Sequence, residues 1–245
     1  MEFTTIVIII LTYFIASFFG SMIGGGSLLA IPVLIFAGLP PHIAIGTNKI
    51  GSMGISYGAS VGYKKEQKLE LRSVFFLMLF GSIGAIIGSL IILSIPENLV
   101  KKIISFIIIA ITAFLLVDKD GKAKISKKIN QSLLSVYVFL SGIYSGFYTA
   151  GVGIINRFVF SKFFSLPILS GSALSTMLGV ASNSISFLVF AYFGYIKYSL
   201  FVPILLTSVL GAYLGAKYSV RLGNEKIKYV LAAASLIMAI KLLFF

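Results

Sequence analysis

Two glycine-rich stretches inside apolar segments are the residues best suited to chemistry in this sequence. They are Gly24-Gly25-Gly26-Ser27 and, half a chain later, the stretch that contains Gly151 and Gly153. Glycine is a poor helix former, so each stretch predicts a break in an apolar helix. Lipid cannot hydrogen-bond broken backbone, which is tolerated only where it is buried in protein or lines a cavity. Paired breaks in two halves predict the substrate cavity of a secondary transporter.

The charged residues in the spans favour an anion as the substrate. Lys49 lies inside the span that begins near His42, and Arg157 follows the second break, whereas all seven acidic residues fall in loops or at span ends. Cation transporters and carboxylate relays place acids at membrane depth. Backbone N–H groups at the starts of the short helices after the breaks would also favour an anion. The alternatives are a Lys49 that snorkels to the headgroups and an Arg157 that anchors a helix at the interface.

Hydroxyl and amide side chains near the breaks complete the candidate site. The predicted substrate-binding residues are Gly24, Gly25, Gly26, Ser27, Thr47, Asn48, Lys49, Gly151, Gly153, Asn156, Arg157 and Ser172. His42 titrates near neutral pH and could couple transport to protons, although its place after two prolines favours a plain interfacial residue. Asn183 with Ser182, Ser184 and Ser186 either lines a path or bonds neighbouring helices. No catalytic residue and no metal ligand is predicted.

Composition identifies an all-α polytopic membrane protein. Of the 245 residues, 58% are hydrophobic and only 11% are charged, against about a quarter charged in soluble domains. The net charge of +13 comes from basic residues at span ends and loops, where anionic lipid headgroups are nearer partners than nucleic acid. The absence of cysteine and the single histidine exclude cysteine-based and multi-histidine metal sites, and we expect no cofactor. The start of the sequence lacks the basic region of a signal peptide, so the first span is expected to be retained.

The order of apolar segments suggests an internal duplication. Residues 1–117 form a first transmembrane repeat, 118–131 a basic cytoplasmic linker, and 132–245 a second repeat, with about eight transmembrane helices in total. Each repeat contains a glycine-broken segment followed by a short half-helix, at 28–36 and 154–164. Paired Gly-x-x-x-Gly motifs, at Gly84 and Gly211, are read as close helix packing.

Loop charges suggest that the repeats are inverted. The loop at 64–72 is rich in basic residues, whereas its counterpart in the second half, at Lys197, is poor in them. For the hinges the pattern is reversed: the one after Pro96 is poor in basic residues, and its counterpart near Arg221 is rich in them. If basic loops are cytoplasmic, the two halves have opposite orientations. Inversion requires an odd number of crossings in each half, so the short pieces would have to count as crossings. Two parallel halves of four spans are the alternative.

The first repeat resembles a known family. Gly-x-x-x-Gly-Gly-Gly-Ser-Leu-Leu-Ala-Ile-Pro-Val-Leu, then Gly-Leu-Pro-Pro-His-Ile-Ala-Ile-Gly-Thr-Asn, then Lys-Leu-Glu-Leu-Arg, are similar to the sulfite exporter TauE/SafE family of membrane transporters. The resemblance covers the whole chain and is strongest over residues 18–72. It implies export or uptake of a small sulfur-containing anion, such as sulfite, thiosulfate or an organosulfonate like sulfoacetate.

The sequence therefore predicts a non-enzymatic secondary transporter in the cytoplasmic (inner) membrane. We expect export of the sulfur anion by alternating access around a mid-membrane site. A passive anion channel is an alternative, as is an intramembrane enzyme acting on a lipid phosphate. The enzyme is disfavoured because one histidine and no mid-span acid leave no base or nucleophile for such chemistry. The expected partners are the anion and membrane lipid, with monomer and homodimer both open.

Overall fold

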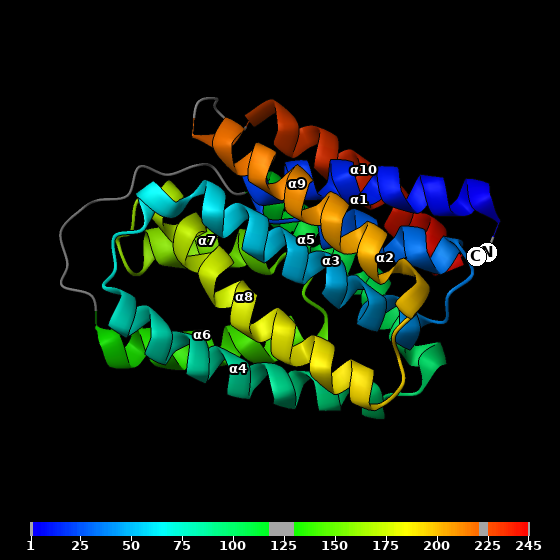
Figure 1. Cartoon of the computed structure of the whole chain (residues 1–245), viewed down its shortest axis with the longest axis horizontal. Helices are drawn as coiled ribbons and strands as arrows, with labels where there is room; N and C mark the ends of the chain where they lie inside the picture. Colours follow the sequence, from blue (N-terminus) through cyan, green and yellow to red (C-terminus); the bar gives the residue numbers. More distant parts are fainter. Residues whose placement is uncertain (1, 118–129, 221–224, 245) are drawn as a thin grey trace.

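The computed structural model describes residues 2–117, 130–220 and 225–244, and these fold entirely into helices, without a strand (Figure 1). The first half contains α1 (Phe3–Ile23), α2 (Ser27–Phe36), α3 (Pro41–Gly62), the 3-10 turn η1 (Lys64–Glu66), α4 (Leu71–Ser94) and α5 (Glu97–Val117). The second half contains α6 (Gln131–Phe147), α7 (Val152–Lys162), α8 (Ile168–Tyr192), the turn η2 (Tyr198–Leu200), α9 (Phe201–Ser219) and α10 (Glu225–Phe244). The predicted linker at 118–131 lies, up to residue 129, outside the described residues.

Five helices of the described chain are long and apolar enough to cross a membrane. They are α1, α4, α5, α8, and α9 together with the turn before it. The sequence predicted about eight spans, and the difference has two physical causes. Polar residues lower the hydropathy of α3 although it has 22 residues, and other helices are short, with 17 residues in α6 and 10 in α2.

Both predicted helix breaks are present. Helix α1 ends at Ile23, where Gly24 takes a φ of 102° and its N–H donates to the Gly20 carbonyl oxygen at 2.6 Å. Helix α6 ends at Phe147, and the chain turns through Thr149 at φ 73° and Gly151 at φ 79° before α7 begins. The left-handed backbone that glycine adopts readily therefore stops each helix. This confirms that no straight helix runs through either stretch.

Six of the described helices pack side by side in one row. Helices α3 and α8 contact each other at the centre; α9 packs on α3, α4 packs on α8, and α1 and α6 pack on α9 and α4 respectively (Figure 1). Glycines bring α4 close to α6, and α9 close to α1. A Cβ at Gly88 would lie 1.9 Å from the Ile143 carbonyl oxygen, and a Cβ at Gly215 would lie 2.0 Å from the Phe18 carbonyl oxygen. The Gly-x-x-x-Gly motifs thus serve close helix packing, as predicted.

The contacts also give the direction of each helix. Along α1, Phe14 and Phe18 meet Gly211 and Gly215 of α9 in the same order, so these helices run the same way. The same criterion aligns α3 with α9, and α4 with α6. By contrast, the start of α3 meets the end of α8, because the Gly46 backbone faces the Tyr195 carbonyl oxygen. Helices α1, α3 and α9 therefore run in one direction, and α4, α6 and α8 in the other (Figure 1).

Candidate functional site

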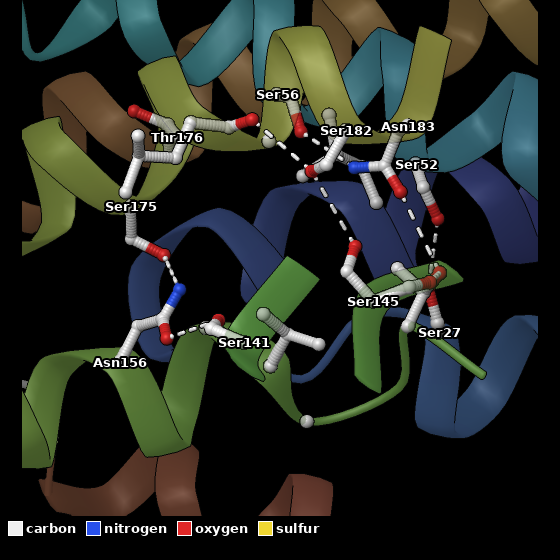
Figure 2. Close-up of a pocket in the computed structure, with 18 of the residues that line it drawn as sticks. Ser27, Ser52, Ser56, Ser141, Ser145, Asn156, Ser175, Thr176, Ser182 and Asn183 are labelled. Carbon is white, nitrogen blue, oxygen red and sulfur yellow. Dashed lines mark hydrogen bonds between the residues drawn. The ribbon is translucent and has the colours of Figure 1, made fainter. Parts of the chain in front are cut away.

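The two breaks touch each other and border one cavity. A Cβ added to Gly24 would lie 2.3 Å from the carbonyl carbon of Gly153, and one added to Gly153 would lie 2.6 Å from the Gly24 Cα. A cavity of about 90 Å³ lies beside this contact, walled by α1, α3, α6, α7 and α8 (Figure 2). It has room for a few water molecules or one small ion. The two breaks, which are far apart in the sequence, therefore meet beside one shared cavity.

The cavity wall is polar but almost uncharged. Its polar side chains are Ser21, Ser27, Ser52, Ser56, Ser141, Ser145, Thr149, Asn156, Arg157, Ser172, Ser175, Thr176, Ser182 and Asn183. Among the described residues that line it, Arg157 is the single charged side chain, and no carboxylate is present. Hydroxyls and amides can donate hydrogen bonds to an anion, whereas a carboxylate would repel it. The wall thus has the composition of an anion site.

One side of the wall is a hydroxyl and amide cluster at the first break. The hydroxyl oxygens of Ser27 and Ser52 lie 3.1 Å apart, and the Asn48 side-chain amide donates to both, at 3.1 and 3.2 Å. Behind the wall, the Tyr13 hydroxyl donates to the Asn48 Oδ1 at 3.1 Å. Because Tyr13 and Asn48 are buried, they fix the positions of the two serine hydroxyls that face the cavity. Asn48 therefore acts behind the wall and does not line it.

The neighbouring part of the wall is formed by α6 and α8, together with Ser56 of α3. The Asn183 amide donates to the Ser56 hydroxyl at 3.2 Å, and the hydroxyls of Ser145 and Ser182 lie 3.5 Å apart (Figure 2). Ser182 and Asn183 thus line the cavity and also contact neighbouring helices, so both interpretations of this patch apply to them. Ser184 instead donates to the Val180 carbonyl oxygen within its own helix.

Asn156, on α7, is held by three hydroxyl groups. Its Oδ1 accepts from Tyr137 at 2.6 Å and from Ser141 at 2.8 Å, while its Nδ2 donates to Ser175 at 3.0 Å (Figure 2). Asn156 therefore joins α6, α7 and α8 at one point of the wall, with Ser141 and Ser175 beside it in the cavity.

Arg157 links the second half to the first break. Its Nε donates to the Ser172 hydroxyl at 2.6 Å, one Nη donates to the Met22 carbonyl oxygen, and the other lies 3.5 Å from the Tyr63 hydroxyl. Met22 is in the last turn of α1, where the carbonyls carry the negative end of the helix dipole. The guanidinium therefore caps α1 while one side of it borders the cavity.

Lys49 makes the reciprocal contact at the second break. Its side chain is fully buried, and Nζ donates to the carbonyl oxygens of Ser145 and Gly146, at 2.6 and 2.9 Å, and to the Thr149 hydroxyl at 2.6 Å. An ammonium group has three donors, and these three oxygens use them all. Lys49 thus caps the end of α6 from the first half, as Arg157 caps α1 from the second. It does not line the cavity.

The structure brings together most of the predicted site. Eight of the predicted residues line the cavity: Gly24, Gly26, Ser27, Gly151, Gly153, Asn156, Arg157 and Ser172. Gly25, Thr47, Asn48 and Lys49 lie outside it; the Thr47 hydroxyl accepts a bond from the Lys197 N–H at 3.0 Å. His42 is remote, at the start of α3.

Serine and threonine residues inside the long helices of the bundle were the part of the site that sequence reasoning missed. They include Ser52 and Ser56 on α3, and Ser141 and Ser145 on α6. Each pair is spaced four residues apart, which places both hydroxyls on one face of a helix. That spacing was the available signal. It went unused because serine in a membrane helix often bonds only its own backbone.

Loss of the Lys49 cap is expected to impair function more than folding. In Lys49→Met the bond to Thr149, a non-glycine residue at φ 73°, is lost, so the second break is less firmly held. Each lost charge-assisted bond costs about 1.5–3 kcal/mol. This loss is offset because the methionine no longer carries the desolvation cost of a buried ammonium ion. We expect about a tenfold lower transport activity in liposomes with a small change in melting temperature. Lys217→Met, at a lysine that lies over the Tyr213 ring, is the matched control, and wild-type activity of Lys49→Met would contradict this role.

Comparison with known proteins agrees with this architecture. The family model described as "Sulfite exporter TauE/SafE" matches residues 9–242. A "Probable membrane transporter protein" of Haemophilus influenzae is 31% identical, over 94% of this chain and 91% of its own length. "Probable membrane transporter protein ORF9" of a Sinorhizobium species is 29% identical, over 99% of this chain and 94% of its own. No solved structure matches the chain. Two helix breaks touch in the structure, and the family model matches the chain over nearly its full length. The chain therefore belongs to the sulfite exporter TauE/SafE family of membrane transporters.

Proposed function

We propose that the protein is a secondary transporter that exports a small sulfur-containing anion, such as sulfite, thiosulfate or sulfoacetate, across the cytoplasmic membrane. The observation that carries the proposal is the cavity at the contact of the two breaks, lined by hydroxyls, amides and Arg157. The description of the matching family supports sulfite and the export direction.

The proposed site binds the anion with neutral donors and one cation. Helices α2 and α7 begin at Ser27 and Val152, directly after the two breaks, and helix starts of this kind favour anions. The hydroxyls of Ser27 and Ser52 add donors that Asn48 holds in place. Arg157 supplies the positive potential at the cavity, whereas the saturated Lys49 contributes at a distance, through the end of α6.

We further propose that the two halves form an inverted repeat around this site. The helix order of residues 3–117 recurs in 131–244. Corresponding helices run in opposite directions: α1 against α6, α3 against α8, and α4 against α9. Opposite orientation requires an odd number of crossings per half, and five helices in each half, the short α2 and α7 included, meet that requirement. Rocking of such repeats about a shared site is a common form of alternating access.

Basic residues support one orientation in the membrane. The described lysines and arginine of the α3–α4 connection, Lys64, Lys65, Lys68 and Arg72, lie at the same end as Lys217, in the last turn of α9. Helix α5 ends and α6 begins at that end, and the sequence between them, residues 118–131, is also lysine-rich. Since positive loops stay in the cytoplasm, we assign this end to the cytoplasm and the starts of α3 and α5 to the opposite side (Figure 1).

Single cysteines in this cysteine-free chain test the inverted arrangement. Glu70, before α4, and Tyr198, before α9, occupy corresponding positions in the two halves. In intact cells a membrane-impermeant maleimide is expected to label Tyr198→Cys at once and Glu70→Cys only after lysis. Parallel halves would place both cysteines on the same side, and labelling of both variants in intact cells would overturn the proposal.

Exchange measurements test the transport function. Purified protein in liposomes loaded with sulfite, thiosulfate or sulfoacetate is expected to release the anion faster when the same anion is present outside. A carrier shows this stimulation because its loaded form reorients faster than its empty form, whereas a passive channel does not. Release without stimulation would favour the channel, and no release of any of the three anions would reject the proposed substrates. Empty liposomes and Gly153→Ala protein serve as controls.

A further inference from the structure

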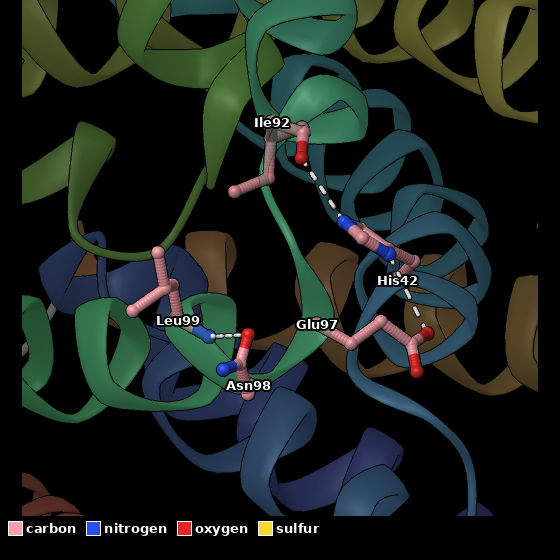
Figure 3. Close-up of polar contacts among 5 residues, drawn as sticks. All are labelled: His42, Ile92, Glu97, Asn98 and Leu99. Atoms are coloured by element: carbon pink, nitrogen blue, oxygen red, sulfur yellow. Dashed lines mark hydrogen bonds and ion pairs between the residues drawn. The ribbon is translucent and has the colours of Figure 1, made fainter.

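A buried histidine lies at the end of the bundle opposite the basic loops. His42 is the single histidine of the chain, and its side chain is only 5% exposed in the first turn of α3. Its Nε2 lies 3.0 Å from the Ile92 carbonyl oxygen near the end of α4, and its Nδ1 lies 3.4 Å from the Glu97 Oε1 at the start of α5 (Figure 3). The ring therefore bridges α3, α4 and α5.

Both ring nitrogens face oxygen atoms that accept hydrogen bonds. A neutral imidazole has one N–H, so its other nitrogen would present a lone pair to an acceptor. Only the doubly protonated ring can donate to both Ile92 and Glu97. The geometry thus fits a bound proton, and release of that proton removes one of the two bonds that His42 makes to α4 and α5.

Charges and helix dipoles of both signs surround His42. The Glu97 carboxylate and the C-terminal end of α4 favour a cation, because exposed carbonyls carry the negative end of the helix dipole. Burial and the N-terminal end of α3 disfavour it.

Few other titratable groups face the ring. The Tyr195 ring, from the α8–α9 connection, lies 5.3 Å from the His42 ring, between centroids. Lys197 follows in the same connection and Lys101 lies one turn after Glu97 in α5, but in the described part of the chain His42 is the only basic group within 4.0 Å of the Glu97 carboxylate. The Glu97 side chain is 50% exposed, which gives the buried ring a route to solvent.

The position of His42 connects it to the proposed substrate cavity. Two to four turns further along α3 are Asn48, Ser52 and Ser56, which hold or line the cavity. On the other side of the contact, Ile92 belongs to α4, which packs along α6 and α8. A change in the His42 contacts can therefore alter how the start of α3 sits against α4 and α5.

We propose that His42 and Glu97 form a proton-binding site that holds the start of α3 against the α4–α5 connection and couples anion movement to protons from the side opposite the basic loops. The coupling rests on the proposed transport function, whereas the proton site does not. Glu97 exchanges protons with solvent, and His42 converts proton binding into a contact between helices.

Nuclear magnetic resonance of the imidazole tests the proton site without any transport. Protein labelled with ¹⁵N-histidine and purified through a histidine-free tag gives signals from one ring. At about pH 6.5 the ratio of doubly to singly protonated His42 is expected to fall about tenfold in Glu97→Gln, because an opposite charge is lost. Glu70→Gln, an exposed carboxylate at the other end of the bundle, should leave the ratio unchanged. A ring that does not titrate between about pH 5 and 8, or an equal ratio in Glu97→Gln, overturns the site.

Transport of thiosulfate, whose charge stays constant over this pH range, tests the coupling. In liposomes containing wild-type protein, a pH gradient is expected to change the uptake rate several-fold relative to equal pH. In His42→Gln the ratio of the two rates should fall to one, and in Glu70→Gln it should match the wild type. The same ratio in His42→Gln and wild type overturns the coupling. If wild-type protein moves none of the proposed anions even in exchange, the proposed function and the coupling both fail, while the imidazole measurement still decides the proton site.

Discussion

Gly153→Ala is expected to lower anion exchange at least tenfold while the protein stays folded. The added Cβ would lie 2.6 Å from the Gly24 Cα and 2.8 Å from its carbonyl oxygen, both backbone atoms that cannot rotate away. Overpacking of this kind costs about 1–3 kcal/mol, and about 1.4 kcal/mol imposed on one state of the cycle slows it tenfold. Initial exchange rates in liposomes, with melting temperatures of the purified variants, measure the effect.

Two further glycines separate steric contact from backbone strain. Gly38 has a φ of 90°, close to the 102° of Gly24, but a Cβ there would meet nothing within 4 Å. Gly38→Ala therefore carries the strain of a left-handed residue without the clash, and it should exchange anions at close to the wild-type rate. Gly24→Ala combines strain and clash, so it should be the most impaired of the three. Normal exchange by Gly153→Ala would show that contact between the breaks does not matter for transport.

Arg157→Gln is expected to weaken anion binding about tenfold or more. Among the described residues that line the cavity Arg157 is the single cation. At an effective dielectric constant of about 20, its attraction for an anion at about 4 Å is ~4 kcal/mol before desolvation. A third of that energy corresponds to roughly a tenfold change in dissociation constant. Calorimetric titration of purified protein with sulfite at two salt concentrations measures it, and the difference from wild type should shrink at the higher salt.

Two other variants distinguish charge at the cavity from the cap on α1. Arg157→Lys keeps the charge but cannot reproduce the forked bonds to Ser172 and Met22, so its affinity should be intermediate. Lys162→Gln removes an exposed cation from the last turn of the same helix and should leave the affinity unchanged. Equal sulfite affinity in wild type and Arg157→Gln would assign Arg157 to the α1 cap alone and leave the anion to the hydroxyls and backbone amides.

The sequence alone determined where helices begin and end, because those limits depend on local chemistry. Apolar runs of about 20 residues marked the long helices. The proline of the hinge at Pro96 marked the start of α5, and glycines marked the two breaks. The predicted short helices at 28–36 and 154–164 differ by only one or two residues from α2 (Ser27–Phe36) and α7 (Val152–Lys162). The glycine breaks and Arg157 were therefore found at the cavity as the sequence indicated.

Only the tertiary structure decided what each polar side chain bonds, because that depends on contacts between residues far apart in sequence. A lysine inside a span reads as a ligand for an anion, but Lys49 meets carbonyl oxygens 96 and 97 residues away that use up its donors. Ser52 and Ser56 read as ordinary helix serines until α3 and α8 place them against the breaks. His42 likewise gained its two acceptors from Ile92, 50 residues later in the chain, and Glu97. The hydrophobic pattern fixes which segments enter the membrane, whereas the packing of one half against the other sets the partners of the few polar groups inside it.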